Sequence, residues 1–177
     1  MQLNVFSTDN EKSGFRLQYM EVFNWGTFDE TIHSIHPGGE TSLLTGANGS
    51  GKTTFVDALL TLIVPEKRYR FYNQSSGSEK KGDRTEETYL LGGYGSINTE
   101  SGSSTKTLYL RENKETAYSI ILAHFANEAD QSVTLFQVRY FGNADMKKYF
   151  GIAHKQLMIE DDFKPFIPAE KKLPELT

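Results

Sequence analysis

The residues from Gly46 to Thr54 have the types and spacing most clearly suited to chemistry. They read Gly-Ala-Asn-Gly-Ser-Gly-Lys-Thr-Thr and fit G-x-x-x-x-G-K-[ST], the pattern of the phosphate-binding P-loop. Glycines allow the backbone to take positive φ and to approach a ligand closely. Successive N–H groups can then converge on phosphate oxygens at the positive end of a helix. The residues predicted to bind the nucleotide are Gly46, Ala47, Asn48, Gly49, Ser50, Gly51, Lys52, Thr53 and Thr54.

Three side chains of this loop have separate predicted roles. Lys52 is expected to reach the β- and γ-phosphates, Thr53 to ligate Mg²⁺ through its hydroxyl, and Thr54 to contact the α-phosphate side. The alternative is a glycine-rich turn that holds no phosphate. It leaves a Gly-Lys-Thr sequence at the start of a helix without a structural reason.

The flanking residues predict the elements that position the loop. Thr41–Thr45 is predicted to be a short strand entering the loop, and Phe55–Val64 a helix leaving it, which Pro65 ends. The helix is apolar nearly all round, so we expect it to be buried in the concave side of a sheet. Asp57 is its one charge, and we expect it to face the loop or solvent.

The remaining residues predict a mixed α/β fold with antiparallel strands. Residues 1–14 form a loose leader, residues 15–163 the folded part, and residues 164–177 a linker or the lead-in to a coiled coil. A turn with aromatic anchors, 24–28, separates two strands, and a turn at 36–40 follows them. A loop is predicted at 66–84, a short helix at 85–94 and a second loop at 96–104. The predicted strands are 15–23, 30–35, a three-stranded meander of 105–111, 117–127 and 131–141, and then 156–160.

Composition limits the classes of protein. The 177 residues suffice for one domain, and they contain no cysteine, which excludes disulfides and thiolate metal sites. No apolar run approaches the roughly 20 residues that span a bilayer, and no signal peptide is visible, so we expect a cytoplasmic protein. The net charge of −4 means that any contact with nucleic acid requires a local basic patch. The four histidines lack metal-ligand spacing.

The run from Phe15 to Val64 resembles the N-terminal half of an SMC-type ATPase head. The likeness rests on the first predicted strand, on Asn-Trp-Gly-Thr-Phe at 24–28, and on the loop followed by Phe-Val-Asp-Ala-Leu. Residues 68–73 and 84–95 resemble the MukB-like branch, and within it the JetC family, the SMC-like subunits of Wadjet anti-plasmid systems. The order of two strands before the loop strand differs from that of small GTPases, where the P-loop follows the first strand.

This resemblance implies an ATPase head split by a long coiled coil. The missing C-terminal half of the same head would supply the signature motif, the Walker B aspartate and the catalytic glutamate, so this segment would carry no catalytic residue. Two heads would enclose ATP and Mg²⁺, together with kleisin-type and accessory subunits, and would act on DNA at the nucleoid. Loop extrusion, plasmid defence and chromosome maintenance remain open.

Two segments superficially resemble the missing motifs. Leu90–Tyr94 resembles a signature loop, but no amphipathic helix follows, so we interpret it as a turn. Leu157–Asp162 resembles a Walker B strand, but only three apolar residues precede its acids, which favours a solvated strand end. Gln156 is a weak candidate for the Q-loop glutamine.

A cluster of basic and aromatic residues follows the predicted helix. The predicted contacts to the DNA backbone are Arg68, Arg70, Lys80, Lys81 and Arg84. Arg68 or Arg70 can instead reach ATP, and a solvated loop is the further alternative because glutamates dilute the charge. For the whole chain, the alternatives are a self-contained P-loop kinase or GTPase and a nucleotide-dependent interaction module without hydrolysis.

Overall fold

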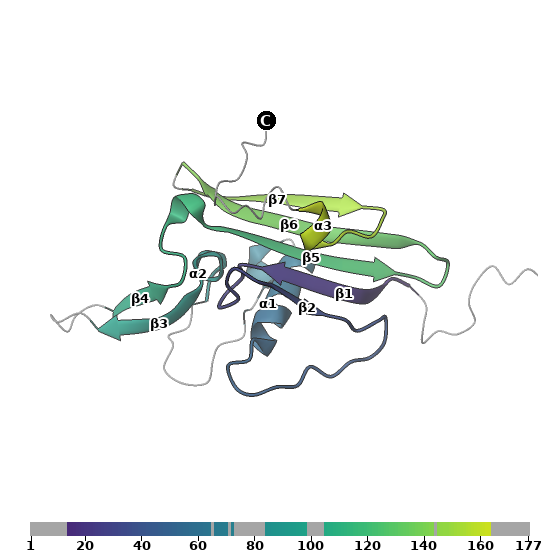
Figure 1. The fold of residues 1–177 in the computed structure, drawn as a ribbon, viewed down its shortest axis with the longest axis horizontal. Helices are drawn as coiled ribbons and strands as arrows, with labels where there is room; N and C mark the ends of the chain where they lie inside the picture. The colour runs from purple at the N-terminus through teal and green to yellow at the C-terminus, as the bar shows by residue number, and fades with distance from the viewer. Residues whose placement is uncertain are drawn as a thin grey trace, which may run out of the picture.

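A five-stranded antiparallel sheet forms the centre of the molecule (Figure 1). The computed structural model describes residues 14–64, 66–70, 72, 84–98, 105–143 and 145–163. The strand order is β2-β1-β5-β6-β7, and every pair is antiparallel. The strands are β1 (Arg16–Phe23), β2 (Ile32–Ile35), β5 (Tyr118–Ala126), β6 (Ser132–Gly142) and β7 (Asp145–Ala153). The predicted α/β class with an antiparallel meander is confirmed.

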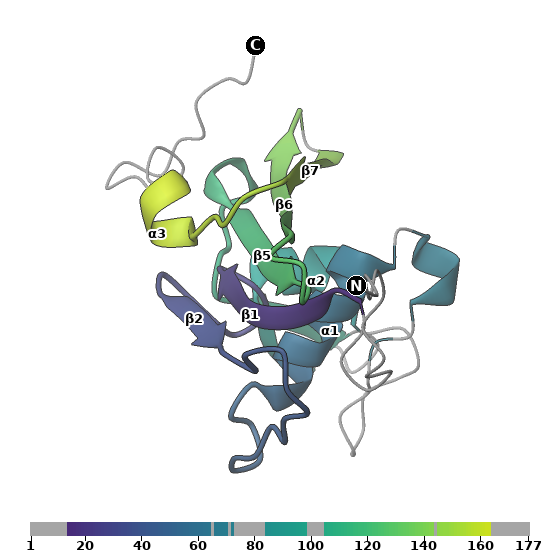
Figure 2. The same ribbon diagram turned by 90° about the vertical axis from the view of Figure 1, so that its right-hand side faces the viewer.

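The helices lie on both faces of this sheet. They are α1 (Lys52–Ile63), α2 (Glu86–Leu91) and α3 (Ile159–Asp162), with single 3₁₀ turns at Lys67–Tyr69 and Lys114–Thr116. Figure 2 shows α1 and α3 on opposite sides of the sheet. On the α1 side the core contains Met20, Val22 and Ile121, and on the α3 side Tyr19, Phe23 and Ile120.

The first strand is buried on both faces, which its alternation alone does not predict. Strict alternation along the strand would place Leu17, Tyr19 and Phe23 on one face. The register shifts between Leu17 and Tyr19, and this irregularity places Leu17 against the α1 side of the core. Such a bulge reverses the side to which the following residues point.

The meander is displaced by one strand from its predicted position. Thr105–Arg111 was expected to be its first strand, but β4 (Thr105–Tyr109) instead pairs with β3 (Gly93–Asn98) in a separate two-stranded ribbon. The start of the predicted loop 96–104 is therefore strand, and residues 99–104 lie outside the described part. The third strand of the meander is β7, whose Lys147, Lys148, Tyr149 and Phe150 are all exposed. An edge strand with two exposed faces lacks the apolar alternation by which strands are predicted.

Two further predicted strands are wrong. Residues 41–45 have no regular secondary structure, pair with no strand of the described sheet, and are exposed. Residues 156–158 are coil, and residues 159 and 160 are the first residues of α3. The predicted short helix is confirmed as α2, because Thr85 and Thr88 form a reciprocal capping box and Gly92 ends the helix with φ 70°.

Candidate nucleotide-binding site

The loop at 46–51 has the backbone conformation that its sequence predicts. Gly46, Gly49 and Gly51 have φ of 154°, 82° and 89°. Gly51 is the N-cap of α1, which begins at Lys52. Residues 46–50 are exposed and Thr53 and Thr54 are half-buried. The first backbone N–H groups of a helix have no partner within the helix. The predicted binding residues therefore form one continuous segment that ends in the first turn of α1.

Lys52 is folded back over the loop that precedes it. Its Nζ donates to the Gly46 carbonyl at 2.7 Å and the Ala47 carbonyl at 2.8 Å, and it lies 3.5 Å from Ser50 Oγ. The Lys52 ammonium group thus lies at the centre of the loop. An anionic ligand bound there would replace the neutral carbonyl oxygens as its partner. The geometry suits a phosphate group held by one mobile cation and backbone amides.

An aromatic side chain from the turn after β1 supports the loop from below. The Phe28 ring packs directly on Gly51, so that a Cβ added there would overlap the ring. The ring centroid of Phe28 also lies 5.0 Å from that of Phe55 in α1 and 4.1 Å from that of His33 in β2. The sequence shows aromatic residues in this turn but carries no signal that Phe28 touches the P-loop, because that contact depends on how β1 and α1 pack.

Asp57 is buried, which corrects the prediction that it faces the loop or solvent. Its side chain has no exposed surface, and it accepts a hydrogen bond from the Tyr89 hydroxyl of α2. Arg84 Nη1 lies 3.9 Å from the same carboxylate and 3.4 Å from the Tyr89 hydroxyl. Burial, followed by the bond to Asp57, raises the pKa of Tyr89, so that this hydroxyl remains a donor. Asp57 therefore fastens α1 to α2.

A buried ionic cluster joins the segment after α1 to the sheet. Glu86 forms ion pairs with Arg70 and with Arg139, whose Nη1 lies 2.7 Å away. Arg139 also donates to Gln137, and Gln137 Nε2 donates to the Thr61 carbonyl at 2.8 Å. Burial alone would raise the pKa of Glu86, but the two arginines lower it below its ordinary value. The cluster thus keeps a carboxylate charged inside the fold.

The predicted DNA-contact residues do not form one patch in the described structure. Arg70 is buried in the ion pair with Glu86, and Arg84 points toward Asp57 and Tyr89. Arg68 is exposed, stacks over Tyr69 and pairs with Glu66 at 2.6 Å. Lys80 and Lys81 lie outside the described residues. Arg70 is therefore removed from the predicted set, because its guanidinium is not accessible to a phosphate backbone.

The two segments that superficially resemble a Walker B strand and a signature loop lie in other elements. Glu160 and Asp161 belong to α3, and the α3 backbone N–H of Ile159 donates to Glu21 on the sheet face away from α1. Gln156 is exposed and directly precedes Leu157, which belongs to the core on the α3 side. Gly92 forms the turn between α2 and β3, which begins at Gly93, and no helix follows. Among the described residues, no group of three or more His, Cys, Asp or Glu is placed to hold a metal ion.

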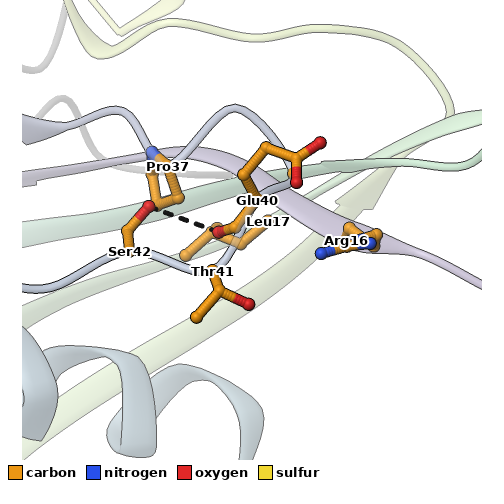
Figure 3. A pocket seen from close by; sticks show the side chains of 7 residues that line it. Arg16, Leu17, Pro37, Glu40, Thr41 and Ser42 are labelled. Carbon is orange, nitrogen blue, oxygen red and sulfur yellow. Dashed lines mark hydrogen bonds between the residues drawn. The ribbon is translucent and has the colours of Figure 1, made fainter. Parts of the chain in front are cut away.

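An open pocket of about 380 Å³ lies beside the lead-in to the loop rather than at the loop itself. Figure 3 shows its lining by Arg16 and Leu17 of β1 and by the turn residues Pro37, Glu40, Thr41 and Ser42. Ser42 Oγ donates to the Glu40 carbonyl at 3.2 Å. The pocket contains none of the predicted nucleotide-binding residues.

This chain is similar to a solved structure and matches a protein-family model. A chain from work described as "Structural biochemistry of ATP-driven dimerization and DNA stimulated activation of SMC ATPases" is similar over 82% of this chain and 74% of its own length, with 16% identity and a TM-score of 0.46. No curated protein matches this sequence. Among the described residues, no helix has the length and apolar character needed to cross a bilayer. Residues 17–79 match the family model described as the P-loop containing region of AAA domain, and this stretch runs from β1 through α1.

Proposed function

We propose that this chain is the N-terminal half of an SMC-like ATPase head and that it binds ATP with Mg²⁺. The observation that carries the proposal is the formed P-loop at the start of α1, with three glycines at positive φ and Lys52 at its centre. The match of residues 17–79 to a P-loop region supports nucleotide binding by the same segment. ATP would replace the loop carbonyls as the partner of Lys52.

The loop residues fit a Mg²⁺–triphosphate. Thr53 stands in the first turn of α1, and a hydroxyl oxygen is a suitable ligand for a hard cation. Lys52 Nζ already lies at the loop, bonded to the Gly46 and Ala47 carbonyls, where it can meet a phosphate group. Bound Mg²⁺ would neutralise phosphate charge, while Lys52 and the backbone N–H groups of residues 49–53 orient the phosphates.

The surface beside the loop supports a partner half. Leu43 and Leu44 are 87% and 39% exposed, and Val56 and Ile63 on the outer side of α1 are 50% and 46% exposed. The lead-in strand to a P-loop normally pairs within a sheet, yet residues 41–45 pair with no described strand. Strands from the C-terminal half of the same head would satisfy this backbone and cover these apolar side chains.

The same proposal assigns hydrolysis to groups outside the described residues. Phosphoryl transfer to water needs a carboxylate that positions the nucleophile and another near the metal. The acidic run at 160–162 lies across the sheet from α1, and Asp57 is buried against Tyr89. In the proposal, the C-terminal half and a second head supply the catalytic carboxylates and the signature motif.

The finer assignment rests on the resemblance of residues 68–73 and 84–95 to the MukB-like branch and to JetC. It implies kleisin-type and accessory subunits, action on DNA in plasmid defence or chromosome maintenance, and a cytoplasmic, nucleoid-associated location. For the DNA contact we retain Arg68, Lys80, Lys81 and Arg84, of which Arg68 is exposed on the described surface.

The test is titration of the chain with ATP and Mg²⁺ by calorimetry, comparing the wild type with Lys52→Ala. We expect the variant to bind at least about tenfold more weakly, because it loses the central cation of the phosphate site. Its apo melting temperature should remain unchanged, because Lys52 is bonded only to exposed loop atoms. Equal ATP affinity in the two proteins would contradict the nucleotide site.

A further inference from the structure

Arg111, which follows β4, binds two separate segments with one side chain. Its Nη2 donates to the Gly26 carbonyl at 2.8 Å, and its Nη1 donates to Asp29 at 2.6 Å and to the Phe28 carbonyl at 3.3 Å. Its Nε donates to the Leu90 carbonyl at 2.7 Å, and Nη2 also reaches the Tyr89 carbonyl at 3.1 Å. The guanidinium therefore ties the turn after β1 to the C-terminal end of α2.

The turn that Arg111 holds lies directly against the P-loop. Phe28 packs on Gly51 and against Phe55, as described above. A Cβ added to Gly26 would lie 3.0 Å from Thr54 Cγ2, so the backbone of Gly26 also contacts the first turn of α1. Contacts from Gly26 and Phe28 of this turn thus fix the position of residues 51–55.

The second segment also reaches α1. Tyr89, whose carbonyl accepts from Arg111, donates its hydroxyl to Asp57. The Tyr89 ring stacks on Trp25, with centroids 4.7 Å apart and planes within 4°. Arg111 therefore holds both segments that contact the N-terminal half of α1. The turn after β1 contacts residues 51–55, and Tyr89 contacts Asp57.

We infer that Arg111 is a positioning residue for the nucleotide site, which holds the Gly26–Phe28 turn against Gly51 and so sets the orientation of Lys52 and Thr53. The inference rests on the proposed function, because it needs a nucleotide at the loop. A lysine at position 111 would keep the charge next to Asp29 but cannot bridge two segments, since it lacks the planar fork of the guanidinium. Loss of these hydrogen bonds should change the conformation of the P-loop and weaken nucleotide binding, although Arg111 itself does not line the loop.

The experiment compares Arg111→Lys, Phe28→Leu and the double variant in ATP–Mg²⁺ titrations of the full chain at a temperature where each is folded. We expect Arg111→Lys to raise the dissociation constant about tenfold, within the usual range for coupling between sites. If Arg111 acts through Phe28, the lysine substitution should have much less effect in the Phe28→Leu background, because contacting residues do not contribute additively. The matched control is Lys114→Met, which removes an exposed ion pair three residues away.

A second readout is independent of nucleotide. Trp25 is the one tryptophan of the chain, is fully buried and lies in the turn held by Arg111. Its emission should shift to longer wavelength in apo Arg111→Lys and remain unchanged in Lys114→Met. Wild-type affinity and an unshifted Trp25 emission in Arg111→Lys would overturn the inference and leave the nucleotide site intact. Additive effects of the two substitutions would overturn the route through Phe28, and a wild type that binds no ATP would overturn both proposals.

Discussion

The loop glycines are required for two different reasons, positive φ and the lack of space for a Cβ. Gly49 and Gly51 both have positive φ, but only at Gly51 would an added Cβ meet another residue, the ring of Phe28. Gly49→Ala should therefore cost only the backbone strain, about 1 kcal/mol of unfolding free energy. Gly51→Ala should cost about 2 kcal/mol more, because the ring must move. Chemical denaturation of both variants measures the difference.

The control for this prediction is the pair Gly51→Ala with Phe28→Leu. The smaller side chain should recover part of the loss at Gly51 while leaving Gly49→Ala unaffected. Equal destabilisation by the two glycine substitutions would show that Phe28 does not pack on Gly51 in solution.

A buried histidine predicts how stability changes with pH. His124 Nδ1 lies 2.9 Å from Thr134 Oγ1, whose own proton is donated to the Lys155 carbonyl, and Tyr19 stacks on the ring. Burial lowers the pKa of His124 below its ordinary value of about 6.5. As the pH falls through that value, the unfolded chain takes the proton first, so unfolding free energy decreases until the folded pKa is passed. His124→Gln should flatten this decline between pH 7.5 and 5.5, as measured by chemical denaturation at each pH.

At the scale of elements, the buried ionic cluster of Glu86, Arg70 and Arg139 should contribute more to the free energy of unfolding than the exposed ion pair beside it. Glu86→Gln leaves Arg70 and Arg139 buried without a carboxylate, which should cost about 3 kcal/mol of unfolding free energy. The matched control is Glu87→Gln, which breaks an exposed pair with Lys114 and should cost less than about 1 kcal/mol. Urea unfolding distinguishes the two, and similar losses would contradict the assigned role of the cluster.

The lowered pKa of Glu86 also gives the sign of its acid dependence. A carboxylate with a depressed folded pKa stabilises above the unfolded value of about 4.3, and that contribution is lost as the pH falls through the folded pKa. The wild type should therefore lose stability below about pH 4.3 more steeply than Glu86→Gln. Parallel pH curves for the two proteins would contradict this expectation.

The elements also show what the sequence could predict. The P-loop, β1 and α2 each carry a local signature: the glycine and lysine spacing, the apolar strand, and the Thr85 cap with Gly92. The predictions that were wrong concern residues whose partners are distant in sequence. No local signal pairs the polar strand β3 with β4, or buries Asp57 against Tyr89 and Arg70 against Glu86. The positions of Phe28 and Arg111 are of the same kind, because they follow from the packing of β1, α1 and α2.

At the scale of the whole molecule, the central claim is that this chain binds ATP–Mg²⁺ but supplies only half of a catalytic head. The loop amides and Lys52 can hold phosphates, but binding alone does not stabilise the transition state of hydrolysis. In the proposed head, the C-terminal half would cover the exposed Leu43, Val56 and Ile63.

The most direct test is steady-state phosphate release by the purified 177-residue chain, alone and after addition of the C-terminal half of the same head. We predict negligible turnover by the chain alone despite ATP binding, and turnover that appears with the second half and disappears with Lys52→Ala. Robust turnover by the chain alone that is abolished by Glu160→Gln or Asp161→Asn would contradict the account, because those carboxylates lie across the sheet from α1.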